Sequence, residues 1–203
     1  MKKFFFLPLI ASIAFLAFTI ADPLSKKERK FAVDHLQDTK KELIKTVSRL
    51  NAAQLSFKPA ADRWSVEECV KHIAATEVGL RKWMDNTVKE PANPDKRSEI
   101  KATDEEFNNG FQDRSKKFQA ADEMKPENTP YKTADEALQS FKDNRDNLIQ
   151  YMKGTKDELR NHVAISQMGA MDAYQLVLLI SAHSNRHTQQ IKEVMADPNF
   201  PKK

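Results

Sequence analysis

The sequence predicts an all-α protein, and three observations support this fold class. Only 4 glycines occur among 203 residues, and few segments show the period-two alternation that marks strands. Capping-box sequences at residues 65–68, 103–106 and 133–136 each precede apolar residues at helical spacing. We therefore expect a bundle of helices around one hydrophobic core.

Residues 1–21 have the pattern of a secretory signal peptide. Two lysines follow the initiator methionine, and an uncharged apolar run then extends to Ala21. Small side chains at Thr19 and Ala21 predict cleavage after Ala21, which leaves residues 22–203 as a single domain. The expected location is secreted or periplasmic, without stable membrane insertion after cleavage. An uncleaved membrane anchor is the alternative, because the run is at the short limit for crossing a bilayer.

The charge balance argues against a nucleic-acid-binding protein, and the cysteine count excludes a domain stabilised by internal disulfides. The 33 basic and 29 acidic residues are intermixed, which argues against a nucleic-acid partner. Cys69 is the only cysteine, so the domain has no internal disulfide and must be stabilised by packing. We expect Cys69 to be a buried structural thiol and not a metal ligand or a nucleophile.

The first two helices are predicted from apolar spacing and from their boundaries. The first is expected over residues 25–51, where a segment ending at Pro59 then breaks the pattern. Ser65 and Glu68 form the capping box of the second helix, and this helix is expected to end before Pro91. Trp64 precedes the cap and could pack against the first turn.

The remaining helices follow a polar, proline-containing linker. Its expected range is 90–101, and a loop is expected over 155–171. Gly154 is expected just beyond the end of the helix that precedes this loop. The predicted helices cover residues 103–120, 133–153 and 172 to about 197.

Two histidines lie on the apolar face of the last helix. His183 and His187 share that face with residues such as Ile180 and Ile191. Side chains four residues apart are about 5–6 Å apart at Cβ, so both rings could bind one metal at about 2.0–2.1 Å. The alternative is that both are core histidines satisfied by hydrogen bonds. A zincin site is excluded, because Ser184 stands where that motif has glutamate.

A third histidine completes a candidate ligand set. His72 lies early in the second helix between apolar positions, and a bundle can point it at a neighbouring helix. Three neutral imidazoles would leave one or more coordination positions open, as in catalytic zinc sites.

Two motifs around these histidines resemble the DinB/YfiT-like superfamily of metal-binding four-helix bundles. They are Trp64-Ser-Val-Glu-Glu-Cys-Val-Lys-His72 and Ala182-His-Ser-Asn-Arg-His-Thr-Gln-Gln-Ile191, and the similarity covers essentially residues 22–203. The resemblance implies a four-helix bundle with a short extra helix or a long connection between bundle helices. It also implies a divalent metal ion, most often zinc or nickel, bound by His72, His183 and His187.

The resemblance further implies a metal-dependent enzyme that activates a thiol or water. Relatives in the superfamily are thiol S-transferases, thiol-dependent isomerases or probable hydrolases, so a small-molecule substrate is expected, including a low-molecular-weight thiol. It names no further catalytic residue, and a homodimer is compatible with it. The alternatives are a non-catalytic periplasmic metal-binding or stress-related module, and a structural helical protein whose histidines belong to the core.

Five further polar residues are weighed as site residues. For His35 and His162 we expect solvated or hydrogen-bonded side chains. Gln190 is expected to be a surface amide, with support of a ligand as the alternative. Glu77 and Arg186 are expected to form ion pairs on the helix surface, with a place at a pocket mouth as the alternative.

Overall fold

A computed structural model of the chain describes residues 24–202. The predicted signal peptide at residues 1–21 lies outside the described residues. Among the residues described, no helix combines the length and the apolar character needed to cross a membrane.

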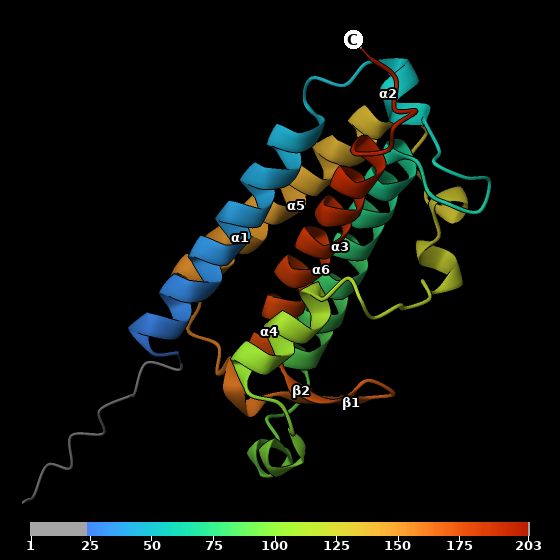
Figure 1. The fold of residues 1–203 in the computed structure, drawn as a ribbon. Helices are drawn as coiled ribbons and strands as arrows, with labels where there is room; N and C mark the ends of the chain where they lie inside the picture. Colours follow the sequence, from blue (N-terminus) through green and yellow to red (C-terminus); the bar gives the residue numbers. More distant parts are fainter. Residues whose placement is uncertain (1–23, 203) are drawn as a thin grey trace, which may run out of the picture.

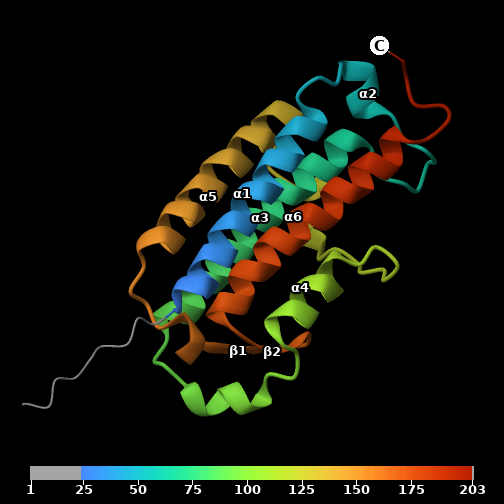
Figure 2. The ribbon, with the colours of Figure 1, turned by 60° about the vertical axis from the view of Figure 1, so that its left-hand side comes forward.

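Four long helices form a bundle, which confirms the predicted fold class (Figure 1). Of these, α1 and α6 run in one direction, and α3 and α5 run in the other (Figure 2). Around the bundle, α6 packs between α1 and α3, and α5 contacts the same two helices. The four helices are α1 (Lys26–Val47), α3 (Val66–Lys89), α5 (Ala134–Gly154) and α6 (Ala173–Met195).

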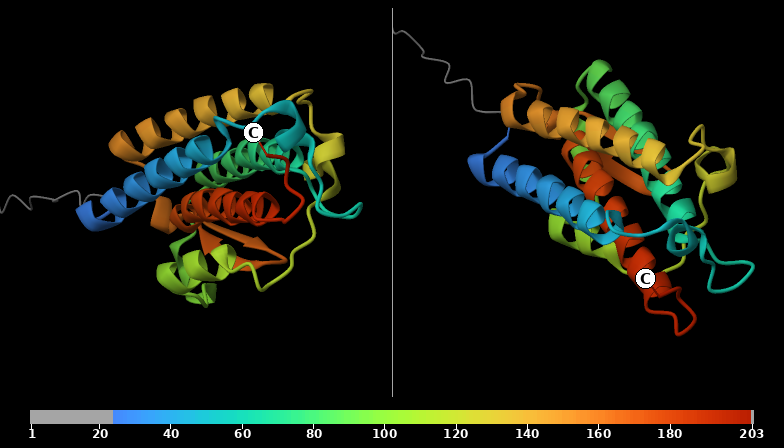
Figure 3. Two further views of the ribbon diagram at one scale, coloured as in Figure 1. Left: turned by 45° about the horizontal axis from the view of Figure 1, so that its top comes forward. Right: turned by 90° about the horizontal axis from the view of Figure 1, so that it is seen from above.

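A long crossover joins α3 to α5. These two helices are parallel neighbours, so the connecting chain has to travel the length of the bundle. The crossover carries a short helix, α4 (Asp104–Gln112), which packs against the outer side of α6 (Figure 3). Shorter elements in the crossover are the 3₁₀ turns η1 (Pro94–Glu99), η2 (Asp122–Met124) and η3 (Pro126–Asn128).

The two ends of the bundle are closed by small elements. At one end α2 (Ala52–Ser56) follows α1. At the other end η4 (Leu159–Asn161) leads into an antiparallel hairpin of β1 (Val163–Ser166) and β2 (Gly169–Asp172). The hairpin register pairs Val163 with Asp172 and Ser166 with Gly169.

Side-chain caps explain where the helices begin. At α3, the Ser65 side chain accepts from the Glu68 amide, and the Glu68 carboxylate accepts from the Ser65 amide. Thr103 and Glu106 form the same reciprocal pair at α4. Thr133 caps α5 with one bond. All three predicted starts are therefore confirmed.

The core consists of two apolar clusters with a polar layer between them. One cluster lies toward the hairpin and includes Tyr174 and Met152, and the other lies toward α2 and includes Phe141 and Val70. The guanidinium of Arg145 lies between them, in the fully buried interior.

Arg145 connects all four bundle helices. It donates two hydrogen bonds to the Glu77 carboxylate in α3, at 2.6 and 2.7 Å. It also donates to Thr39 Oγ1 in α1 at 2.7 Å and to Ser184 Oγ in α6 at 2.9 Å. The expectation that Glu77 forms a surface ion pair was wrong, because its carboxylate neutralises the only fully buried arginine among the described residues.

Four predicted boundaries differ from the structure. The first helix, expected over residues 25–51, ends at Val47, and Asn51 caps the separate helix α2. The helix predicted to residue 120 ends at Gln112, because the following chain turns toward α6. Gly154 is the last residue of α5 and does not lie beyond it. The loop predicted over 155–171 contains the hairpin, whose turn uses Gly169 at a φ of 101°.

Candidate metal centre

The structure brings His72 of α3 together with His183 and His187 of α6. The Nε2 atom of His72 lies 3.1 Å from His183 Nε2 and 3.2 Å from His187 Nε2. One nitrogen of each ring lies within 4.8 Å of the other two. Because α3 and α6 are antiparallel, residues in the first third of α3 meet residues near the middle of α6. The three side chains predicted from the sequence therefore converge.

Hydrogen bonds behind two of the rings determine which nitrogen carries the proton. His72 Nδ1 lies 2.6 Å from the Met124 carbonyl oxygen, which can only accept, so Nδ1 carries the hydrogen. His187 Nδ1 donates to Gln190 Oε1 at 2.9 Å, and Arg114 donates to the same oxygen at 3.4 Å. In the neutral rings of His72 and His187, the Nε2 atoms are therefore lone-pair acceptors that face each other.

Burial favours the neutral form of all three imidazoles. Desolvation is the main reason that the pKa of His72 is lowered, although the Met124 carbonyl acts in the opposite direction. Desolvation and the neighbouring imidazoles lower the pKa of His183 and His187 well below the usual histidine value. Neutral imidazole is the form that binds metals.

This donor set fits a divalent cation. Two nitrogens bound at about 2.0–2.1 Å to one tetrahedral ion lie about 3.4 Å apart, and the separation is about 2.9 Å for right-angled ligands. The distances of 3.1 and 3.2 Å fall between these values. Two unprotonated nitrogens this close repel each other unless a cation or a proton lies between them.

The site is mostly closed by protein. The Trp64 ring lies 4.8 Å from the His72 ring and 6.0 Å from the His187 ring, centroid to centroid. His72 and His187 are buried, whereas His183 is partly exposed. His183 is therefore the least enclosed of the three residues.

The expectation that Gln190 is a surface amide was wrong. Gln190 is partly buried and accepts from His187 Nδ1, which is the contact that the alternative, support of a ligand, requires. Its spacing of three residues from His187 on the same helix is the sequence signal that could have identified it.

Arg186 does not form an ion pair on the helix surface. Its guanidinium donates to the carbonyl oxygens of Asp113 and Lys116, and it lies 4.9 Å from the centroid of the Phe118 ring. Arg186 therefore holds the chain that follows α4 against α6.

The other candidate residues lie outside the cluster. Burial raises the pKa of the Cys69 thiol to about 12, as expected for a structural thiol. His35 Nε2 pairs with Asn108 Oδ1 at 2.8 Å, as expected for a hydrogen-bonded residue. His162 differs from its expectation, because its Nδ1 is buried without a hydrogen-bond partner.

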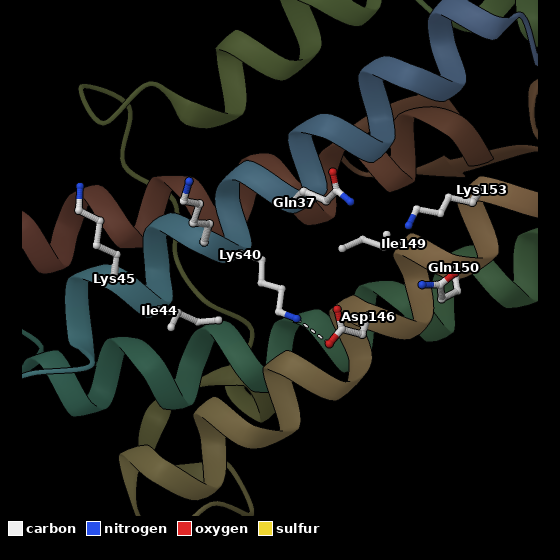
Figure 4. Close-up of a pocket in the computed structure, with 9 residues that line it drawn as sticks. Gln37, Lys40, Ile44, Lys45, Asp146, Ile149, Gln150 and Lys153 are labelled. Carbon is white, nitrogen blue, oxygen red and sulfur yellow. Dashed lines mark hydrogen bonds and ion pairs between the residues drawn. The ribbon is translucent and has the colours of Figure 1, made fainter.

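A groove lies between α1 and α5, away from the two helices that carry the clustered histidines. It encloses about 500 Å³ between α1 and α5 (Figure 4). Lys40, Lys45 and Lys153 line it, and Lys40 pairs with Asp146 at 2.6 Å. None of the three clustered histidines lines this groove.

Comparison with known proteins agrees with this arrangement. Residues 35–191 match the sequence profile described as the DinB superfamily, which is more than half of the chain. The chain belongs to the DinB superfamily. No curated protein shows significant similarity to it.

The DinB-like fold is also similar to a solved structure. That structure is YfiT from Bacillus subtilis, described as a probable metal-dependent hydrolase with an unusual four-helix bundle topology. The match has a TM-score of 0.59 and 14% sequence identity, and covers 88% of this chain and 91% of that one. At this identity the similarity establishes the shared fold.

Proposed function

We propose that this DinB-like protein binds one divalent metal ion through His72, His183 and His187 and is a metal-dependent hydrolase. The proposal rests on the convergence of three imidazole nitrogens, in which His72 Nε2 lies 3.1 Å from His183 Nε2 and 3.2 Å from His187 Nε2. Zinc and nickel are the proposed metals, since both accept imidazole ligands. An ion held there supplies Lewis-acid chemistry that activates water or a thiol near neutral pH.

The protein's own residues prepare the site for such a reaction. Met124 and Gln190 hold two rings with Nε2 directed inward. The Trp64 ring excludes water beside His72 and His187, which strengthens electrostatic interactions within the site. The partly exposed edge of His183 is the proposed approach for a small-molecule substrate.

Water is the proposed nucleophile, and a low-molecular-weight thiol is the alternative. The described function of YfiT favours hydrolysis. We further propose that the protein is exported to the periplasm or secreted, because residues 1–21 have the pattern of a signal peptide. A cytosolic thiol would be scarce in that location.

Turnover by purified protein tests the enzyme proposal. We expect hydrolysis of model esters or amides that disappears with a chelator, returns with Zn²⁺ or Ni²⁺, and is lost in His183→Ala. His162→Ala is the matched control and should retain activity, because His162 lies outside the cluster. Metal-dependent turnover only with a thiol and an electrophile would select the S-transferase alternative. Metal binding without turnover in either assay would select the non-catalytic module.

A further inference from the structure

The segment that follows α4 contacts both helices that carry the clustered histidines. We call residues 113–128 the crossover strap. Its Met124 carbonyl accepts from His72 Nδ1 in α3 at 2.6 Å. Its Arg114 side chain donates to Gln190 Oε1 in α6 at 3.4 Å, and Gln190 accepts from His187 Nδ1. The strap therefore reaches two of the three ligands from outside the bundle.

Further contacts fix the position of the strap against α6 and α3. Arg114 makes a bidentate ion pair with Glu193, at 3.1 and 2.8 Å. Arg186, the residue before His187, donates to two strap carbonyls. On the other side, a Cβ placed on Gly79 of α3 would lie 2.3 Å from the Met124 Cε atom, so Met124 packs directly onto that glycine.

The strap has few buried side chains, and Pro126 is the only buried residue within it. Residues 115–119 are exposed, and the Phe118 side chain is 58% exposed. Segments with few buried apolar contacts open at a lower free-energy cost than the core does. The same segment supplies the acceptor that fixes the proton on His72 Nδ1, so opening it would release that ring.

We propose that the crossover strap is a closing element of the metal centre, in which the Met124 carbonyl, Arg114 and Gln190 are positioning groups for His72 and His187. Strap closure directs two Nε2 lone pairs inward, and a cation bound to those lone pairs holds the strap closed. By linkage, each event strengthens the other. The inference rests on the proposed metal site, and it adds that this segment positions two of the three proposed ligands.

Zn²⁺ affinity in matched variants tests the positioning role. Groups behind metal-binding histidines typically contribute 10–100-fold in metal affinity, so we expect a loss of about that size in Gln190→Leu. Gln190→Glu keeps an acceptor for His187 Nδ1 and should retain most of the wild-type Zn²⁺ affinity. Gln189→Leu is the control, because Gln189 bonds to the Gln112 carbonyl in α4 and to no clustered histidine. The affinity is measured by competition with a chromogenic chelator.

Limited trypsin digestion tests strap closure independently of affinity. Lys116 and Lys117 are exposed cleavage sites within the strap, and Lys101, exposed between η1 and α4, is an internal reference. Zn²⁺ should slow cleavage at Lys116 and Lys117 relative to Lys101 in the wild type. The protection should be smaller in Arg114→Met, because this variant lacks the hydrogen bond to Gln190 and the ion pair with Glu193.

The outcomes separate this inference from the proposed function. Wild-type Zn²⁺ binding with unchanged affinity in Gln190→Leu, or with no protection of the strap, overturns the closing role and leaves the metal site. A wild type that binds no Zn²⁺ overturns both.

Discussion

At the scale of single residues, the environment of Cys69 is as informative as that of the histidines. Cys69 lies on α3 one turn before His72, yet its side chain is fully buried in the apolar cluster near α2. Burial raises its pKa to about 12, so the thiol is protonated at any physiological pH. Cys69 is not among the residues that converge at the site, as expected for a structural thiol.

We predict that Cys69 does not react with thiol reagents in the native protein. With the pKa raised from 9.0 to about 12, the thiolate fraction at pH 8 falls roughly 1,000-fold before access is considered. A chromogenic disulfide at pH 8 should label less than a tenth of the native protein in the time that fully labels the chain in denaturant. Rapid labelling of the native protein would contradict the buried position.

Residue identities revealed the three histidines of the cluster but not the groups that hold their rings in place. His72, His183 and His187 could be predicted because imidazoles on apolar helix faces are chemically unusual. The acceptor for His72 is a backbone carbonyl, that of Met124, and every residue has one, so no side-chain pattern could mark it. Arg145 was also missed, since the charges that surround a buried arginine come from distant positions.

At the scale of elements, helix starts were predicted better than helix ends. A start depends on a local exchange of hydrogen bonds, such as that between Ser65 and Glu68, and is readable from four residues. The end of α4 at Gln112 depends on Arg186, which lies far away in the sequence and binds the carbonyls beyond it. The hairpin was missed because its strands are only four residues long.

We predict that the α3 cap contributes to stability independently of the metal. Ser65→Ala removes the acceptor for the Glu68 amide and should lower the free energy of unfolding by about 1 kcal/mol. Ser65→Asp keeps a side-chain acceptor for the Glu68 amide, so its free energy of unfolding should fall much less. Both values come from urea denaturation of metal-free protein. Equal losses in the two variants would show that the cap itself is not the source.

At the scale of the whole molecule, one buried ion pair connects the bundle. Arg145 and Glu77 lie between the two apolar clusters, and Thr39 and Ser184 complete the layer. These hydrogen bonds form only if the four residues, one from each helix, lie at the same height along the bundle axis. The layer therefore favours one axial alignment of the four helices.

We predict that breaking this pair is strongly destabilising. Glu77→Gln leaves the Arg145 charge buried without a carboxylate and should cost about 3–5 kcal/mol in the free energy of unfolding. Asp85→Asn, which breaks the partly exposed pair between Arg81 and Asp85, should cost less than about 1 kcal/mol. The double variant Glu77→Leu with Arg145→Met should be more stable than Glu77→Gln. Thermal or urea denaturation measures all three, and a small loss in Glu77→Gln would contradict the role of the layer.

The four-helix bundle and the convergence of the histidines together make a metal centre the central claim. Its most direct test is the metal content of the purified protein after incubation with Zn²⁺ and removal of free metal, measured by elemental analysis. We predict one ion per chain in the wild type and in the control His35→Ala, whose side chain bonds to Asn108 outside the cluster. His72→Ala, His183→Ala and His187→Ala should each retain little or none. The claim would be contradicted if the wild type bound no metal, or if all three single variants bound as much metal as the wild type.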